Sequence, residues 1–283
     1  MLNNNIKYHL NNRYITYSNA FITYMKTSRI NYKFITFNDL YRRKLSDTIF
    51  ILGSGPSFGN LSTNEIELIK KNDSFGINYS FLEKRIIPTF HKFGWHAGRY
   101  NRWLKVFKPY RKKYTKVVTF LSYKAMYLKM IHPRLTPNLF PENPIIYLYD
   151  IPDNIVVDKK RKIHDYEFDK SLSYRGGLSL ILHFSVKLKY KNIVLVGVDL
   201  DTNKHFWDNI PIMKTDVNLR LKNISKTHNV HNFESQYIKK GKMITFENYL
   251  YQVSNYLKTK KNINLFIASK ENMLTKNLPI YFL

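Results

Sequence analysis

The motif best suited to ligand chemistry in this 283-residue chain is the loop Gly53-Ser54-Gly55-Pro56-Ser57. It follows the apolar run 48–52, which is typical of a buried parallel strand that feeds a helix. Glycines at such a turn let backbone amides approach an anion, and Pro56 with Ser57 favours a helix start. The loop therefore predicts a phosphate or ribose site, although a tight turn without a ligand has the same pattern. It is neither a P-loop nor a complete dinucleotide fingerprint, because the required lysine and third glycine are missing.

Two carboxylates, Asp199 and Asp201, follow a second apolar run at 193–198. Open α/β sheets bind their ligands at the carboxyl ends of the strands, so these residues belong with the glycine loop as site candidates. They could hold Mg²⁺ or Mn²⁺ against a diphosphate. Alternatively, one aspartate is structural and the other exposed, and the spacing leaves both interpretations open.

Three histidines, His205, His228 and His231, lie downstream of this second run and are the candidates for proton transfer. Each could act as a general base or contact a phosphate. His228 and His231 could also form a zinc pair, but no third ligand stands out.

These residues require a scaffold of alternating strands and helices. Hydrophobic patterning predicts strands at 48–52, 74–78, 87–91, 116–121, 144–149, 193–198 and 262–268, and helices at 62–71, 123–132, 178–190 and 247–258. This alternation indicates an α/β fold with a mainly parallel sheet and helices on both faces.

Composition narrows the class of partner and the compartment. The formal charge of +26 indicates an anionic partner, such as nucleic acid, phospholipid headgroups or an acidic glycan, although an AT-rich genome would also raise the lysine content. The absence of cysteine excludes disulfides and thiolate metal sites. No stretch reaches the roughly 18 apolar residues of a membrane span, and no signal peptide is recognisable. We therefore expect a cytoplasmic protein, either soluble or peripheral on the inner face of the cytoplasmic membrane.

The charge pattern suggests how the chain is divided. Residues 1–45 form a basic, aromatic N-terminal extension, which could lie on an anionic membrane or pack on the domain. Residues 46–283 are expected to form one catalytic domain, with lid or acceptor segments at about 150–175 and 202–245. Residues 99–116 contain eight basic residues and no acidic one, at helical spacing over 99–108. They indicate either an anion-binding face or a solvated one.

Three segments together resemble the bacterial sialyltransferases of glycosyltransferase family 42. They are the glycine loop, the segment 76–81 (Gly-Ile-Asn-Tyr-Ser-Phe), and Arg175-Gly176-Gly177 leading through a helix to the run that ends at Asp199. The same segments resemble the wider clan of motility-accessory-factor and pyrophosphokinase-like proteins. The resemblance covers roughly 48–268 in short motifs and leaves out the N-terminal extension.

This resemblance implies a modified Rossmann-like fold, a CMP-activated nonulosonic acid donor and no metal requirement. Ser54 takes the place of a donor-contacting Asn, Asn78 matches the Asn that recognises the nucleotide sugar, and Gly176-Gly177 matches a turn near the donor phosphate. His231, and next His228, fits the family's general base. Asp201 stands where the family has a phosphate-binding Tyr, which would move that contact to Lys204, His205 or Arg175, or indicate a metal and a different donor.

Three functions follow from these observations. The first is a glycosyltransferase that moves a sugar from a nucleotide donor onto a bacterial surface glycan or glycolipid without a cofactor. The second is a Mg²⁺-dependent phosphotransferase of the pyrophosphokinase-like kind. The third, which the strand and loop pattern disfavours, is a basic nucleic-acid-binding protein. The donor sugar, the acceptor, the linkage and the oligomeric state are not encoded in recognisable motifs.

Overall fold

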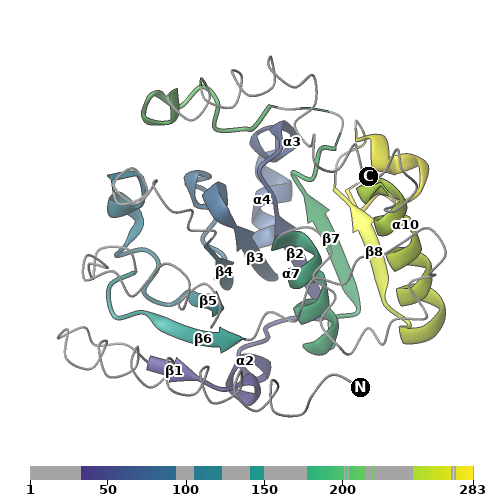
Figure 1. Ribbon diagram of the computed structural model, residues 1–283, viewed down its shortest axis with the longest axis horizontal. Helices are drawn as coiled ribbons and strands as arrows, with labels where there is room; N and C mark the ends of the chain where they lie inside the picture. Colours follow the sequence, from purple (N-terminus) through teal and green to yellow (C-terminus); the bar gives the residue numbers. More distant parts are fainter. Residues whose placement is uncertain are drawn as a thin grey trace, which may run out of the picture. The chain divides into compact units, whose positions relative to one another are not determined.

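The computed structural model describes residues 33–93, 105–122, 141–149, 177–200, 202, 204–214, 218, 245–268, 270 and 272–282. The chain forms two compact units, and Figure 1 shows the elements of both. Unit 1 consists of Met1–Arg42 and Thr89–Ile151, and unit 2 of Arg43–Pro88 and Pro152–Leu283. The predicted domain limits and lid stay predictions, because residues 1–32 and most of the predicted lid lie outside the described residues.

Unit 1 contains four parallel strands in the order β1-β6-β5-β4. They are β1 (Lys33–Ile35), β4 (Phe90–Lys92), β5 (Val118–Ser122) and β6 (Ile145–Tyr149), with α2 (Phe37–Arg42) and the 3₁₀ turn η2 (Lys108–Tyr110) between them in the sequence. The pairing of β1 with β6 places the end of the predicted N-terminal extension in this sheet. Of the predicted basic face, residues 105–107 are helical, and Lys105 and Lys108 are exposed.

Unit 2 also contains four parallel strands, in the order β3-β2-β7-β8. They are β2 (Thr48–Leu52), β3 (Asp73–Ile77), β7 (Asn192–Val196) and β8 (Asn264–Ile267). β2 lies in the middle, with Leu52 in register with Gly76 of β3 and Val196 of β7. The strand that follows β2 in the sequence (β3) and the strand that follows β7 (β8) lie on opposite sides of this pair, so the order in which strands are added to the sheet reverses between β2 and β7. The predicted parallel α/β sheet is confirmed.

The helices of unit 2 are α3 (Pro56–Gly59), α4 (Thr63–Lys70), α7 (Gly177–Lys187) and α10 (Phe246–Tyr256). Side-chain caps begin two of them, with Ser62 at α4 and Thr245 at α10. Ser62 and Glu65 form a capping box at α4, with Ser62 N to Glu65 Oε2 at 2.6 Å and Glu65 N to Ser62 Oγ at 3.3 Å. Such a cap stabilises a helix by about 1 kcal/mol. The predicted helix at 62–71 is confirmed, with Ser62 as its N-cap.

Shorter turns complete the unit. They are the 3₁₀ turns η1 (Asn78–Leu82), η5 (Pro211–Met213) and η7 (Met273–Lys276), and the π turn η6 (Leu257–Lys261) that extends α10. Asn262, in the left-handed conformation, ends that turn before β8.

Helices cover both faces of the unit 2 sheet. Phe50 and Leu52 of β2 pack with Ile66 and Ile69 of α4, whereas α7 contacts β2 and β3 and does not belong to that cluster. Figure 1 shows α7 in front of these strands and α4 behind them. All five residues of β2 are buried, as expected of a strand that is covered on both faces. No helix among the described residues is long and apolar enough to cross a membrane.

Candidate functional site

The loops that follow β2 and β7 lie in direct contact at the carboxyl edge of the unit 2 sheet. Gly53 N donates to Val196 O and Gly55 N donates to Gly197 O, each at 2.7 Å. A Cβ atom on Gly53 would lie 2.3 Å from Gly197 O, and one on Gly55 would lie 2.4 Å from Asp199 Oδ2. The glycines are therefore required by the close approach of two protein loops, before any ligand is considered.

Asp199 is the acceptor at the centre of this contact. Its Oδ2 accepts from Ser57 N at 2.8 Å, and its Oδ1 accepts from Ser57 Oγ at 2.7 Å and from Asn272 Nδ2 at 2.9 Å. Buried Asn272 also donates to Val198 O at 2.9 Å and accepts from Leu274 N at 2.9 Å. Asp199 thus connects the ends of β2, β7 and β8, and the anion at the start of α3 is a carboxylate of the chain itself.

Ser54 joins the β2 loop to the segment after β7. Its carbonyl oxygen accepts from Phe206 N at 3.1 Å and lies 3.2 Å from His205 Nδ1. Because a carbonyl only accepts, His205 Nδ1 carries the hydrogen and Nε2 is the basic nitrogen of the neutral ring. His205 N is held in turn by Asp208 Oδ2 at 3.0 Å.

Two aromatic rings extend this contact to the end of β3. The His205 ring stacks on Trp207 with centroids 4.4 Å apart and planes at 25°, and Trp207 meets Tyr79 edge-on at 5.5 Å. Tyr79 follows Asn78, which adopts a left-handed conformation at φ 50° directly after β3. Ser54, Asn78 and His205, predicted from separate stretches of sequence, are therefore brought to one place.

An ion pair stiffens the segment after η1. Arg85 contacts Glu83 through two bonds of 2.8 Å, and its guanidinium also donates to the carbonyls of Leu61 and Gly59. Burial by itself would raise the pKa of Glu83, but the hydrogen bonds and charge of Arg85 outweigh it and lower that pKa. This pair fixes the chain between α3 and α4 relative to β3.

The remaining predicted residues divide into two groups. Pro56 is the first residue of α3, Gly177 is the first residue of α7, and Lys204 is exposed, with its amide bonded to Thr202 Oγ1 at 3.1 Å. Their predicted donor contacts stay predictions. The candidates that lie outside the described residues are Arg175, Gly176, Asp201, His228 and His231.

Asn272 is a site residue that sequence patterning did not single out. Tyr79 belongs to the segment 76–81 that carries the resemblance, and Trp207 lies two residues after His205, so both were marked by their neighbours in the sequence. Asn272 lies 73 residues from Asp199, and its only signal is its place after the last strand.

This arrangement of side chains suits a nucleoside or sugar ligand. Aromatic rings beside amide, hydroxyl and imidazole groups offer stacking and hydrogen bonds to such a ligand. The described residues contain no group of three or more His, Asp or Glu that could hold a metal. Asp199 already accepts three hydrogen bonds, and a Mg²⁺ ion on Oδ1 would compete with the two that this oxygen accepts from Ser57 Oγ and Asn272 Nδ2.

Comparison with solved structures finds sialyltransferases. The sialyltransferase CstII from Campylobacter jejuni in complex with CMP-3FNeuAc is 15% identical, covering 82% of this chain and 86% of that one, with a TM-score of 0.46. The monofunctional α-2,3-sialyltransferase Cst-I from the same organism is 14% identical, covering 89% of this chain and 84% of that one, with a TM-score of 0.44. No family model and no curated protein matches. These TM-scores are below 0.5, and the likeness by itself assigns no function to this chain.

Proposed function

We propose that this protein is a glycosyltransferase that moves a sugar from a nucleotide donor, in particular a nonulosonic acid from CMP, onto a bacterial surface glycan or glycolipid. The observation that carries the proposal is the convergence of Ser54, Asn78 and His205 at one edge of the unit 2 sheet. The strand order reverses between β2 and β7, and open α/β sheets bind nucleotides at the carboxyl ends of the strands at such a point. The choice of CMP and of a nonulosonic acid rests on the resemblance of the sequence motifs.

The proposed reaction is a single displacement. The acceptor hydroxyl oxygen forms a bond to the anomeric carbon, the bond from that carbon to the phosphate oxygen breaks, and CMP leaves with the bonding electron pair. The proton of the acceptor hydroxyl passes to a histidine. His205 is suited to this role because Ser54 fixes its tautomer with Nε2 as the basic nitrogen. His231 and His228 remain candidates for the same role.

Asp199 has a positioning role in this proposal. Its carboxylate is bonded to Ser57 and Asn272, so it holds the glycine loop in place and contacts no donor group. The same bonds disfavour the Mg²⁺-dependent phosphotransferase, for which Asp199 would have to be a metal ligand. Arg175, Gly176 and Lys204 are proposed contacts of the leaving phosphate, as the motif resemblance implies.

The binding step can be tested by thermal unfolding with CMP, UDP, GDP and ATP, each with Mg²⁺ or with EDTA. A ligand at about 100 times its Kd adds about 2.7 kcal/mol to the stability of the state it binds. We expect CMP to raise Tm in EDTA. Stabilisation by ATP only with Mg²⁺ would favour the phosphotransferase, and silence from every nucleotide would refute a nucleotide site.

Two asparagines allow a matched control. Asn78 and Asn262 both have left-handed backbones, at φ 50° and 53°, so glycine removes either side chain without strain. We expect Asn78→Gly to remove the CMP-dependent rise in Tm and Asn262→Gly to keep it. His205→Gln should keep that rise and lower kcat by about 10²-fold or more, the usual contribution of a general base. Equal responses of the two glycine variants would contradict the proposed site.

A further inference from the structure

The opposite edge of the unit 2 sheet, where its strands begin, is strongly cationic. We refer to it as the amino edge. The segments that lead into β2, β3, β7 and β8 are 43–47, 70–72, 187–191 and 257–263, and parallel pairing places them all at this edge. These segments contain ten basic residues and one acidic residue, the exposed Asp47. The basic residues are Arg43, Lys44, Lys70, Lys71, Lys187, Lys189, Lys191, Lys258, Lys260 and Lys261.

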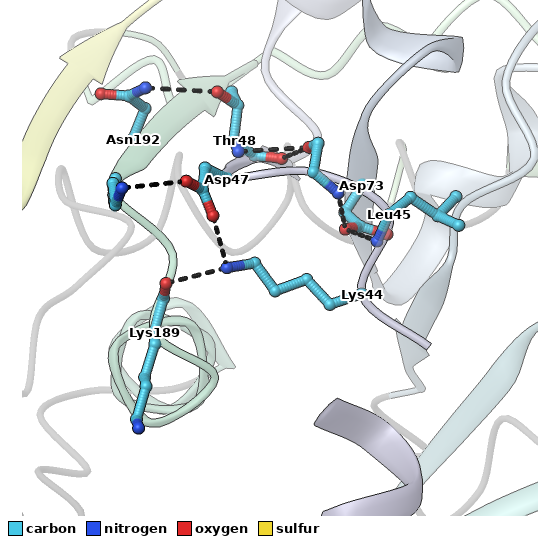
Figure 2. Close-up of polar contacts among 9 residues, drawn as sticks. Lys44, Leu45, Asp47, Thr48, Asp73, Lys189 and Asn192 are labelled. Carbon is cyan, nitrogen blue, oxygen red and sulfur yellow. Dashed lines mark hydrogen bonds and ion pairs between the residues drawn. The ribbon is translucent and has the colours of Figure 1, made fainter. Parts of the chain in front are cut away.

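The few anionic groups of this edge are occupied by individual lysines. Figure 2 shows Lys44 Nζ donating to Asp47 Oδ1 at 2.8 Å and to Lys189 O at 2.9 Å. Lys191 Nζ lies 3.2 Å from the other Asp47 oxygen, and these two lysines lower the pKa of Asp47. Lys70 pairs with Glu67 in the last turn of α4. Eight of the ten basic side chains are exposed, and the carboxylates of Asp47 and Glu67 pair with three of the ten, namely Lys44, Lys70 and Lys191.

Helix dipoles explain only part of this charge. α4, α7 and the turn after α10 all end at the amino edge, and a cation in a helix's last turn is favourable. That effect fades within one turn, yet Lys189 and Lys191 lie beyond α7 and Lys71 lies beyond α4. The side chain of Leu45 is 74% exposed among these cations, the most exposed large apolar residue of the described chain.

We propose that the amino edge is a docking surface for an anionic phospholipid membrane. Lysines near such a surface each contribute favourable electrostatic energy, and an exposed leucine can enter the headgroup layer. Nucleic acid fits less well, because nine of the ten cations are lysines, which lack the bidentate fork of arginine. In these segments the one aromatic residue, Tyr190, is buried and cannot stack on bases. This surface is separate from the proposed nucleotide site and does not depend on it.

The test uses the full chain and flotation with vesicles of phosphatidylcholine, alone or mixed with phosphatidylglycerol. The amino-edge variant changes four exposed lysines to glutamine, namely Lys71, Lys187, Lys258 and Lys260. Its matched control makes the same change at four exposed lysines of unit 1, namely Lys105, Lys108, Lys112 and Lys113, so both variants lose the same net charge. Equal Tm values check that both fold.

We expect the wild type to float only with anionic vesicles, and less at high salt. The amino-edge variant should lose about tenfold or more in partition coefficient, since each surface lysine is worth up to about fivefold. The control should stay within about twofold, because it leaves every lysine of the amino edge in place. Leu45→Gln, a change at an exposed site, should lower partitioning about threefold.

Three results would overturn the proposal. An equal loss of vesicle binding in the two lysine variants would mean that binding depends on the net charge of the protein and not on the amino edge. Failure of the wild type to float with anionic vesicles would exclude the membrane. The third result concerns random-sequence DNA. If it binds the wild type more tightly than the vesicles do, and the amino-edge variant loses this binding, the surface belongs to nucleic acid.

Discussion

The two edges of the unit 2 sheet each use a carboxylate to hold a loop, but their surroundings differ. At the carboxyl edge, Asp199 accepts from Ser57 and Asn272, and at the amino edge fully buried Asp73 accepts from Leu45 N at 2.7 Å and Ser46 N at 3.2 Å. The segments before β2, β3 and β7 contain seven basic residues and one exposed acid, whereas the described segments after them, 53–62, 78–85, 197–200 and 204–208, contain three of each sign. A carboxylate thus holds a loop at each edge, but the described segments are nearly neutral at the carboxyl edge and strongly cationic at the amino edge.

The rings near the two anchors differ as well. Tyr190 is buried behind Asp73, and burial together with that carboxylate raises the pKa of its hydroxyl, so it stays protonated at neutral pH. At the carboxyl edge, Tyr79 and His205 are only partly buried. A ligand can therefore reach polar ring groups at the carboxyl edge, while the amino edge offers mainly the heads of its lysines.

The largest expected effect is on the free energy of unfolding, and it compares one residue with a left-handed backbone at each edge. Gly197 has φ +65°, and a Cβ atom there would lie 2.6 Å from Phe58 Cβ. Gly197→Ala should lower the free energy of unfolding by about 3 kcal/mol or more, combining left-handed strain with overpacking. At the amino edge Lys189 has φ 57°, and Lys189→Gly should leave stability unchanged or raise it by up to about 1 kcal/mol. Urea unfolding measures both, and a loss of stability in Lys189→Gly would contradict the contrast.

The next effect compares the two anchors directly. Asp199→Asn and Asp73→Asn each replace an acceptor oxygen by a donor that faces hydrogen-bond donors, so each should lower the free energy of unfolding by about 1–3 kcal/mol. Only Asp199→Asn should also weaken the CMP-dependent rise in Tm, because it releases the loop that carries Ser54. Thermal unfolding with and without CMP distinguishes the two variants. Equal loss of the CMP effect in both would mean that the edges are not independent.

The smallest effect is a pH dependence at the carboxyl edge. Because Arg85 lowers the pKa of Glu83 below its ordinary value of 4.5 in the folded state, the pair stabilises the fold above that pH. This stabilisation, about 1 kcal/mol, is lost as pH falls through the lowered pKa. Glu83→Gln should flatten the dependence of unfolding free energy on pH below about 4.5. Asp47→Asn, at an exposed pair of the amino edge, should change it less; the reverse order would be inconsistent with the burial of Glu83.

Patterns local in the sequence predicted much of the described fold. The apolar runs at 48–52 and 193–198 became β2 and β7, and the predicted helix at 62–71 became α4. The glycine loop was correctly placed at a strand end, since a parallel strand and the turn after it are encoded by neighbouring residues. The predicted helix at 123–132 lies outside the described residues.

The partners within the site were not predictable in the same way. The sequence left Asp199 as either a metal ligand or a structural carboxylate, and in the fold its oxygens are bonded to Ser57 and Asn272. These contacts depend on the order of the strands in the sheet. β7 is the neighbour of β2 on the side away from β3, and β8 lies next to β7. Such neighbours are set by crossover connections and packing, and no short-range periodicity records them.

The sequence by itself determined the strands, the helix starts, the excess of lysine and the presence of a glycine turn, because each depends on residues close together in the chain. Only the tertiary structure decided that the glycines serve the approach of two loops, that an internal carboxylate occupies the start of α3, and that the lysines before four strands share one edge. The physical reason is that parallel strands bring distant segments to a common edge, where the side chains that meet are chosen by topology.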